Sequence, residues 1–336
     1  MISAAVYGIA GAVLTQDERA FFRDADPLGF ILFARNCANA GSIQRLTGDL
    51  RDLLGREDVP VLIDQEGGRV MRLRPPDWPD APPARTIANF YERNQEIGRE
   101  IAETLGRMFG AMLIEVGIDV DCAPVLDLGF PNTTDAIGNR AYSAHPEIVT
   151  HLGQAMARGL MREGCLPVIK HMPGHGRCTV DSHKHLPRVD ADLLTLRTHD
   201  FVPFRAARDL PLGMSAHVVY SAIDPERAGT VSGSVINELI RGEIGFDGFL
   251  LTDDIAMDAL SGSPGESAAA ALTAGCDAVL HCSGNLTEMV DVAGAVSTLT
   301  ELARRRWDRA QAARQNPEGV CYRVLSDTLN ALLNKV

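Results

Sequence analysis

Eight short apolar segments recur along the chain, and they constrain the fold more than any other feature. Each ends in polar residues, and most follow a helix-like segment that stops at glycine. They do not alternate between apolar and polar positions, which is typical of parallel strands covered on both faces. The predicted strands are AVYGIA (5–10), GFILFAR (29–35), VPVLID (59–64), DVDCAPVLD (119–127), LPVIKH (166–171), LGMSAH (212–217), FLLTDD (249–254) and AVLHC (278–282).

Segments with helical periodicity separate these strands. Two of them gather their large aliphatic side chains on one face: residues 42–55, where Ser42 is the expected N-cap, and residues 96–116, which stop at Gly117. Glycine recurs at the ends of such segments, in EVG, REG and TAG, where a helix C-cap favours a left-handed residue. The pattern therefore predicts alternating helices and strands.

Eight such units in 336 residues predict a closed (β/α)8 barrel, the TIM barrel, which typically takes about 250 residues. A doubly wound open sheet would need a glycine-rich phosphate turn after its first strand, and YGIAGA (7–12) matches that pattern poorly. Residues 286–336 carry no further strand signal and are expected to form two or three helices that pack on the barrel. We therefore expect residues 1–336 to form a single catalytic α/β domain.

Charge and cysteine content restrict the setting of the protein. A net charge of −12 disfavours nucleic acid as the main partner. Seven cysteines without a CxxC pair indicate free thiols in a reducing compartment. The apolar N-terminus has no preceding Lys or Arg and is followed by TQDE, unlike a signal peptide, and no other segment approaches the roughly 20 apolar residues of a membrane span. We expect a cytoplasmic protein that binds no membrane and is a monomer or weak oligomer.

A barrel of this type places its chemistry where the strands end. The predicted strands end in acidic, basic and histidine side chains, so we expect a polar pocket at that end of the barrel. Neighbouring residues of a strand point to opposite sides, so only one of Asp253 and Asp254 is expected to face the pocket. The polar strand ends are Asp64, Asp127, Lys170, His171, His217, Asp253 and Asp254.

The segment KHMPGHGRCTVDSHKH (170–185) has two interpretations. His171 and His175 could bind a metal, but Pro173 prevents the helix that would bring them together, and the first strand lacks the histidine pair of barrel metallohydrolases. Alternatively, Asp181 can hydrogen-bond one ring nitrogen of His183 and leave the other nitrogen free to transfer protons. We favour proton transfer and keep the metal site as an alternative. A carboxylate at the barrel mouth opposite such a donor suits glycosyl transfer.

Four motifs resemble those of the family 3 glycoside hydrolases in order and spacing. The closest similarity is to the single-domain bacterial β-N-acetylglucosaminidases, and it extends from about residue 25 to residue 285. The motifs are VLIDQEGGRVMRLR (61–74), IGNRAYS (137–143), KHMPGHGRCTVDSH (170–183) and LTDDIAM (251–257).

The resemblance implies a role for each matching residue. Asp253 corresponds to a catalytic nucleophile and His183 to a general acid/base, with Asp181 as its partner. The residues that correspond to ligands of the N-acetylglucosamine unit are Asp64, Arg72, Arg140, Lys170 and His171. No metal or cofactor is required. Met172 stands where an aromatic residue is common in the family, and we expect this difference to affect substrate preference rather than activity.

The implied activity is retaining hydrolysis of a terminal β-linked N-acetylglucosamine. The expected substrate is a small carbohydrate, an N-acetylglucosaminyl muropeptide from peptidoglycan recycling. Three alternatives stay open: a metal-dependent hydrolase, a phosphorylase that transfers the sugar to phosphate, and a sugar-binding protein without turnover.

Overall fold

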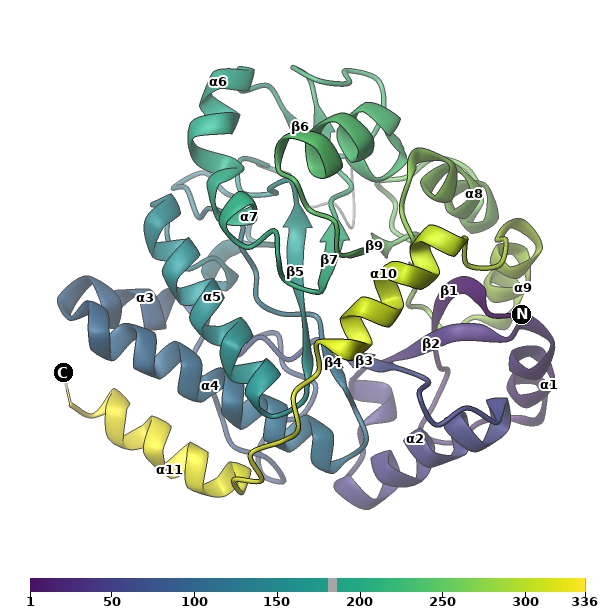
Figure 1. The fold of residues 1–336 in the computed structure, drawn as a ribbon, viewed down its shortest axis with the longest axis horizontal. Helices are drawn as coiled ribbons and strands as arrows, with labels where there is room; N and C mark the ends of the chain where they lie inside the picture. Colours follow the sequence, from purple (N-terminus) through teal and green to yellow (C-terminus); the bar gives the residue numbers. More distant parts are fainter. Residues whose placement is uncertain (181–185, 336) are drawn as a thin grey trace.

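The computed structural model describes residues 1–180 and 186–335, and its centre is a closed barrel of eight parallel strands (Figure 1). Around the barrel the strands follow the order β1, β10, β9, β7, β5, β4, β3, β2. The predicted (β/α)8 barrel is therefore confirmed. Its strands are β1 (Ser3–Gly8), β2 (Pro27–Leu32), β3 (Val61–Ile63), β4 (Val120–Asp121), β5 (Leu166–Met172), β7 (Leu212–Ser215), β9 (Phe249–Asp254) and β10 (Ala278–His281).

Each strand lies within or overlaps a predicted apolar segment, but β4 is much shorter than predicted. It spans two residues, whereas the sequence predicted a strand over 119–127. Pro124 lacks the N–H that a central strand must donate to its neighbour, so regular pairing stops before it. Pairing with β5 resumes at Val125, opposite Lys170. After this bridge the chain leaves the regular strand, and Asp127 lies beside the end of β5, in contact with His171.

Helices surround the barrel and cover the outer face of its strands (Figure 1). Residues 234–243 form a π-helical segment, η5, and residues 196–200 form another, η3. Short 3₁₀ turns occupy 34–36, 138–140 and 229–231. The α-helices are α1 (Gln16–Ala25), α2 (Ala40–Leu54), α3 (Ala84–Arg93), α4 (Gln95–Glu115), α5 (Pro146–Arg162), α6 (Leu193–Thr195), α7 (Val202–Ala206), α8 (Pro264–Ala274), α9 (Leu286–Ala295), α10 (Glu301–Ala312) and α11 (Tyr322–Leu333).

The ends of α2 show one wrong prediction and one that is confirmed. Asn39, not Ser42, is the N-cap, because its Oδ1 accepts the Ser42 N–H at 3.0 Å. Ser42 lies in the first turn and accepts the Asn39 N–H in return at 3.1 Å. The helix ends at Gly55, and α8 ends at Gly275, both with the positive φ that favours glycine.

The C-terminal segment forms three helices, and α10 closes one end of the barrel. In Figure 1 it crosses in front of the strands. Ala303, Trp307 and Ala310 pack among the side chains that fill the barrel, and the Trp307 ring contacts Phe249 edge-on at 5.4 Å. Phe249 begins β9, so the covered end is the N-terminal end of the strands. A functional site is therefore expected at the opposite end, where the strands have their C-termini.

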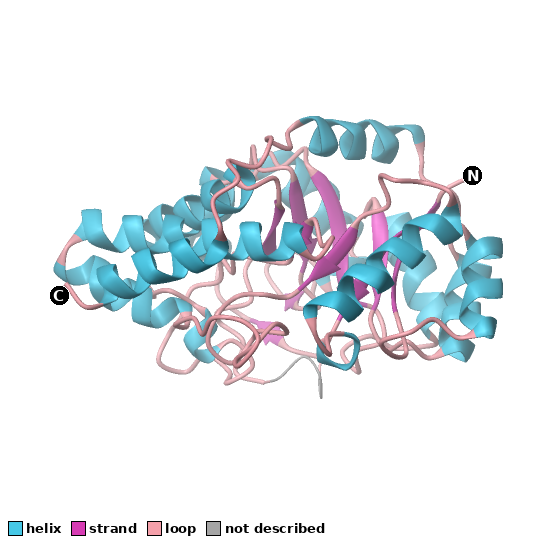
Figure 2. Cartoon of the chain, turned by 90° about the horizontal axis from the view of Figure 1, so that it is seen from below, coloured by secondary structure: helices cyan, strands magenta, loops and turns pink. Residues whose placement is uncertain are grey.

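Long loops gather at the C-terminal end of the strands, which Figure 2 shows from the side. Among them is a feature that the sequence did not predict, a parallel pair of short strands, β6 (Arg188–Val189) and β8 (Val219–Tyr220). In the chain β6 follows β5 and β8 follows β7, so the pair ties the loop after β5 to the loop after β7.

All seven cysteines are free thiols. Among residues 1–180 and 186–335, no helix is both long enough and apolar enough to cross a membrane.

Candidate active site

A pocket of about 300 Å³ opens at the C-terminal end of the strands. Barrel residues form its floor, and the loops after β3, β4, β5, β9 and β10 form its walls. Among its lining residues are Asp64, Arg72, Arg140, Lys170, His171 and Asp253, which the sequence analysis proposed for the site. Asp181 and His183 lie outside the described residues.

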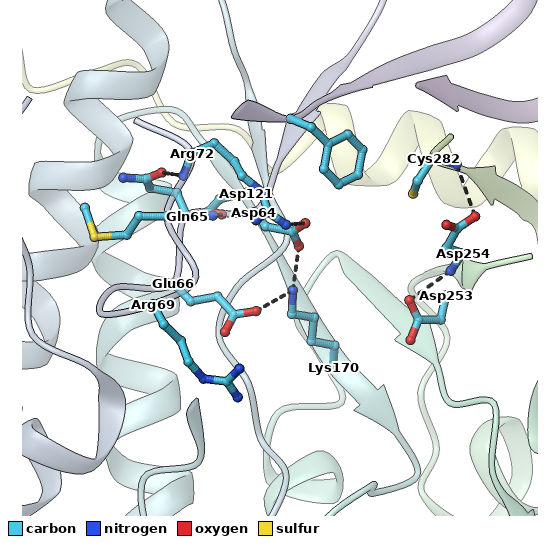
Figure 3. A network of polar contacts seen from close by, with 12 residues as sticks. Asp64, Gln65, Glu66, Arg69, Arg72, Asp121, Lys170, Asp253, Asp254 and Cys282 are labelled. Atoms are coloured by element: carbon cyan, nitrogen blue, oxygen red, sulfur yellow. Dashed lines mark hydrogen bonds and ion pairs between the residues drawn. The ribbon is translucent and has the colours of Figure 1, made fainter. Parts of the chain in front are cut away.

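Lys170 is the centre of a buried charge cluster on one side of this pocket (Figure 3). Only 2% of its side chain is exposed, and its Nζ lies 2.7 Å from Asp64 Oδ1 and 2.7 Å from Glu66 Oε1. Arg72 contacts the other oxygen of Asp64 at 2.8 Å. Arg140 binds Glu66 with two parallel hydrogen bonds of 2.8 and 2.7 Å. Three cations and two carboxylates are therefore held in one network.

The network keeps both carboxylates ionised. Burial alone would raise the pKa of Asp64, but the charges of Lys170 and Arg72 outweigh it and hold the pKa below its usual value. Burial likewise opposes ionisation of Glu66, and Arg140 and Lys170 lower its pKa to about 2. Burial disfavours the charged form of Lys170, yet Asp64 and Glu66 raise its pKa. The cations of this network can donate hydrogen bonds to sugar oxygens, and its carboxylates can accept hydrogen bonds from sugar hydroxyls.

Asp127 fixes the start of the histidine-rich loop. Its Oδ2 lies 2.7 Å from Nδ1 of His171, and its Oδ1 accepts the backbone N–H of His171 at 3.2 Å and of His175 at 2.6 Å. Burial opposes ionisation of Asp127, but the charge of His171 and these hydrogen bonds lower its pKa. An ionised Asp127 requires the proton of His171 on Nδ1, which leaves Nε2 for the pocket.

His175 has a different environment from His171. It is buried, and within the described part of the chain neither of its ring nitrogens has a hydrogen-bond partner. Burial lowers its pKa to about 4, so the ring is neutral near pH 7. Among residues 1–180 and 186–335 there is no group of three His, Cys, Asp or Glu side chains arranged to hold a metal ion.

Asp253 and Asp254 both line the pocket, and the prediction that only one of them could do so is wrong. The register between β9 and β10 shifts at this point: Ala278 pairs with Leu251, but Leu280 pairs with Asp254. One extra residue in β9 breaks the alternation on which the prediction relied. Both carboxylates can therefore face one cavity.

The two carboxylates have opposite electrostatic environments. For Asp253, burial is outweighed by the charges of His171 and His217 and by the Asp254 N–H, and the pKa is lowered. For Asp254, burial dominates, and the neighbouring charge of Asp253 also raises the pKa. Of the two carboxyl groups, Asp253 thus ionises more readily. Opposed pKa shifts in adjacent acids are a feature of catalytic sites.

Two further predicted strand ends support the site from behind the pocket. Asp127 is fully buried beneath His171. His217 is also fully buried; its Nδ1 lies 2.8 Å from Thr230 Oγ1, and its Nε2 lies 2.9 Å from the Asp254 carbonyl oxygen. It holds the end of β9 in place rather than facing the cavity.

Residues 176–178, a few positions before Asp181, are well packed. Gly176 lies so close to the Leu128 carbonyl that a Cβ would clash with it at 1.9 Å. Arg177 lies over the Phe130 ring at 4.5 Å and pairs with Asp200 at 2.8 Å. Cys178 is buried, and burial raises the pKa of its thiol. The backbone is therefore held in place as far as Cys178.

A family model described as "Glycosyl hydrolase family 3 N terminal domain" matches residues 10–314. The chain belongs to glycosyl hydrolase family 3. Two family relatives, both named beta-hexosaminidase, come from Chromobacterium violaceum and Alkalilimnicola ehrlichii. The first is 40% identical over 82% of this chain and 77% of its own length, and the second is 38% identical over 84% and 81%.

A solved family structure is also similar over nearly the whole chain. NagZ from Neisseria gonorrhoeae, in complex with N-trifluoroacetyl-D-glucosamine, superposes with a TM-score of 0.87 at 29% identity and covers 99% of this chain and 98% of its own. These matches confirm the predicted family resemblance and the predicted enzyme class, a glycoside hydrolase of the β-hexosaminidase type.

Several residues of this pocket were not predicted from the sequence. Glu66 was quoted within the motif 61–74 but given no role, although it binds both Lys170 and Arg140. Its position, two residues after Asp64 in the same loop, was the available signal. Gln65 was also missed: its side-chain oxygen accepts the Arg72 N–H at 2.9 Å and so shapes the loop. Arg69 also lines the pocket.

Proposed function

We propose that the protein is a retaining exo-β-N-acetylglucosaminidase in which Asp253 is the nucleophile. The observation that supports this most strongly is the state of Asp253 in the pocket. It is a half-buried carboxylate with a lowered pKa, and one oxygen accepts the Asp254 N–H at 2.8 Å. The other oxygen has no hydrogen-bond partner among the described residues and is available to attack a sugar carbon.

In this proposal the charge cluster binds the terminal sugar. Asp64 accepts from sugar hydroxyls, while Lys170, Arg72 and Arg140 donate to hydroxyl and carbonyl oxygens. His171 contributes Nε2 from the next position along β5. Because the cluster lies across the barrel from β9, a sugar held there can present its anomeric carbon to Asp253. A pocket of about 300 Å³ suits a single terminal sugar.

The reaction has two steps. Asp253 attacks the anomeric carbon and forms a glycosyl ester, while the bond to the leaving oxygen breaks and His183, oriented by Asp181, protonates that oxygen. A water molecule then attacks the same carbon and loses its proton to His183, and the bond to Asp253 breaks. The sugar leaves with its original anomeric configuration, and the enzyme is restored.

We infer further that the substrate is an N-acetylglucosaminyl muropeptide, the disaccharide of N-acetylglucosamine and 1,6-anhydro-N-acetylmuramic acid with or without its peptide. This places the enzyme in peptidoglycan recycling in the cytoplasm. Residues 1–336 then act as one catalytic domain. The relatives named beta-hexosaminidase and the family membership support hydrolysis of a β-linked N-acetylhexosamine, the sugar at the end of this substrate.

The test is release of 4-nitrophenol from 4-nitrophenyl N-acetyl-β-D-glucosaminide by the wild type and Asp253→Ala, with EDTA present. We expect chelator-resistant turnover that the substitution abolishes. Loss of wild-type activity in EDTA would support the metal-dependent alternative. Turnover that depends on added phosphate and yields a sugar phosphate would indicate a phosphorylase. Binding of N-acetylglucosamine without any turnover would indicate a sugar-binding protein.

A further inference from the structure

The short strand β8 lies outside the barrel and pairs with the far end of the loop after β5. The Val219 N–H donates to the carbonyl oxygen of Pro187 at 2.9 Å. The Ser221 N–H donates to the carbonyl oxygen of Val189 at 3.0 Å. The eight strands of the barrel close without this pair, so its role lies in holding the loops.

The side chain of Tyr220 holds the near end of the same loop. It is fully buried, and its hydroxyl donates to the carbonyl oxygen of Gly174, two residues after β5, at 3.0 Å. The strand β8 therefore contacts the loop both at residue 174 and at residues 187–189. The segment between these contacts carries Asp181 and His183, which lie outside the described residues.

The segment 217–220 also reaches the strand that carries the proposed nucleophile. His217, three residues before Tyr220, is fully buried, and its Nε2 lies 2.9 Å from the Asp254 carbonyl oxygen. The Asp254 N–H in turn donates to Asp253 at 2.8 Å. One short segment after β7 thus contacts both the end of β9 and the loop that carries the proposed acid/base.

A retaining glycosidase depends on the distance between its two catalytic groups, which is about 5–5.5 Å. In this chain those groups come from separate places, β9 and the loop after β5. An error of about 1 Å in the position of a catalytic group can lower the rate about 100-fold. The segment 217–220 connects the two places, and the side chains at both its ends are fully buried. It is therefore suited to fix their separation.

We propose that Tyr220 is a positioning residue that holds the loop carrying the acid/base in place relative to the nucleophile. The inference rests on the proposed function and adds the means by which its two catalytic groups are aligned. Tyr220 acts through the Gly174 carbonyl group, because its own side chain is fully buried and does not line the pocket. Removing the hydroxyl takes this donor from the carbonyl group and releases the near end of the loop.

The test uses Tyr220→Phe, which removes only the hydroxyl, and two substrates that differ in their need for an acid. Phenyl N-acetyl-β-D-glucosaminide needs a proton on its leaving oxygen, whereas the 3,4-dinitrophenyl glycoside releases a stable anion. We expect kcat/KM to fall about tenfold or more for the phenyl substrate and to stay within about twofold of the wild type for the dinitrophenyl substrate.

The matched control is Tyr91→Phe, which removes another buried tyrosine hydroxyl. That hydroxyl lies 2.6 Å from Nδ1 of His151, away from the pocket, and both kcat/KM values should stay at the wild-type level. Both substrates are measured on the same preparation of each variant, so the ratio of the two kcat/KM values does not depend on the fraction of protein that is folded.

Equal losses on the two substrates in Tyr220→Phe would overturn the proposal, because a general loss of structure does not depend on the leaving group. An unchanged kcat/KM for the phenyl substrate would overturn it as well. His183→Gly separates this inference from the proposed function, since it should show the same dependence on the leaving group in a stronger form. If His183→Gly shows no such dependence, the assigned acid/base and thus the proposed mechanism are contradicted.

Discussion

The backbone N–H of Asp254 donates to Oδ1 of Asp253 at 2.8 Å, and the two carboxylates line the same pocket. Asp254 is itself held by two backbone N–H groups, those of Ala256 and Cys282, both at 3.1 Å from its Oδ1. The end of β9 is thereby joined to the end of β10. Asp254 thus fixes the backbone from which Asp253, the proposed nucleophile, projects, and burial together with the charge of Asp253 raises the pKa of Asp254.

Asp254→Asn should retain much more activity than Asp254→Ala. The asparagine oxygen can accept the same two N–H groups, whereas alanine leaves both without a partner at a cost of about 1–3 kcal/mol each. We expect Asp254→Ala to lower kcat at least tenfold and the asparagine variant to lower it only a few fold. Steady-state kinetics of the two variants with 4-nitrophenyl N-acetyl-β-D-glucosaminide checks this; equal losses would contradict a positioning role.

The same variant should change how stability depends on pH. Because the pKa of Asp254 is raised on folding, its ionisation destabilises the native protein as the pH rises through that pKa. Asp254→Asn removes this effect. Its melting temperature relative to the wild type should therefore be higher at pH 8 than at pH 4, measured by calorimetry at both values. A difference that is constant with pH would contradict the assigned pKa direction.

Glu66→Gln should weaken both sugar binding and folding. The amide keeps the shape of the side chain but leaves Lys170 and Arg140 with less negative charge in a buried place, and breaking a buried ion pair costs about 3–5 kcal/mol in the worst case. We expect KM to rise at least tenfold. Glu92→Gln, which removes an exposed carboxylate paired with Arg85, is the control and should have little effect on KM.

The charge cluster around Lys170 should also contribute to the stability of the protein in acid. The pKa of Glu66 is about 2 and that of Asp64 is also lowered, so both stabilise the folded state above the pKa of the unfolded chain, about 4. This stability should be lost as the pH falls from about 4.5 towards 2. Denaturant unfolding at several pH values should show a weaker acid dependence in Glu66→Gln than in the wild type. Identical slopes would contradict the cluster's role in stability.

Asp127→Asn should impair the function of His171, although the side chain at position 127 does not line the pocket. The amide is a poorer acceptor for Nδ1–H and can present its own N–H, which favours the wrong tautomer of the ring. We expect kcat/KM to fall by about 10- to 100-fold, as for other residues that orient a functional group from behind. The fold should be retained in circular dichroism. Wild-type kinetics in this variant would show that His171 does not depend on Asp127.

The sequence predicted the barrel because the physical cause is local. Parallel strands buried on both faces are apolar, and glycine at positive φ ends many helices. The alternation of helices and strands can therefore be recognised in the sequence without any contact information. The errors arose where local rules compete. Asn39 and Ser42 are both capping residues three positions apart, and only the folded chain shows which one begins α2.

The site was less predictable because its geometry depends on contacts between strands. The register shift between β9 and β10 brings Asp254 into the pocket, and no property of LLTDD alone signals it. Glu66 becomes part of the site only because Lys170, from β5, and Arg140, from the loop after β4, meet it there. The resemblance to family 3 implied the positions of the proposed sugar-binding residues, but not the network of ion pairs that holds them.

A nucleophilic Asp253 forms a covalent bond to the sugar, and trapping this intermediate would reveal the bond itself. The enzyme is incubated with a 5-fluoro-N-acetylglucosaminyl fluoride, whose glycosyl ester is hydrolysed slowly, and then digested for peptide mass spectrometry. We expect a sugar adduct on the peptide that contains Asp253, with none formed by Asp253→Asn. An adduct on another residue, or none in a wild type that turns over 4-nitrophenyl N-acetyl-β-D-glucosaminide, would contradict it.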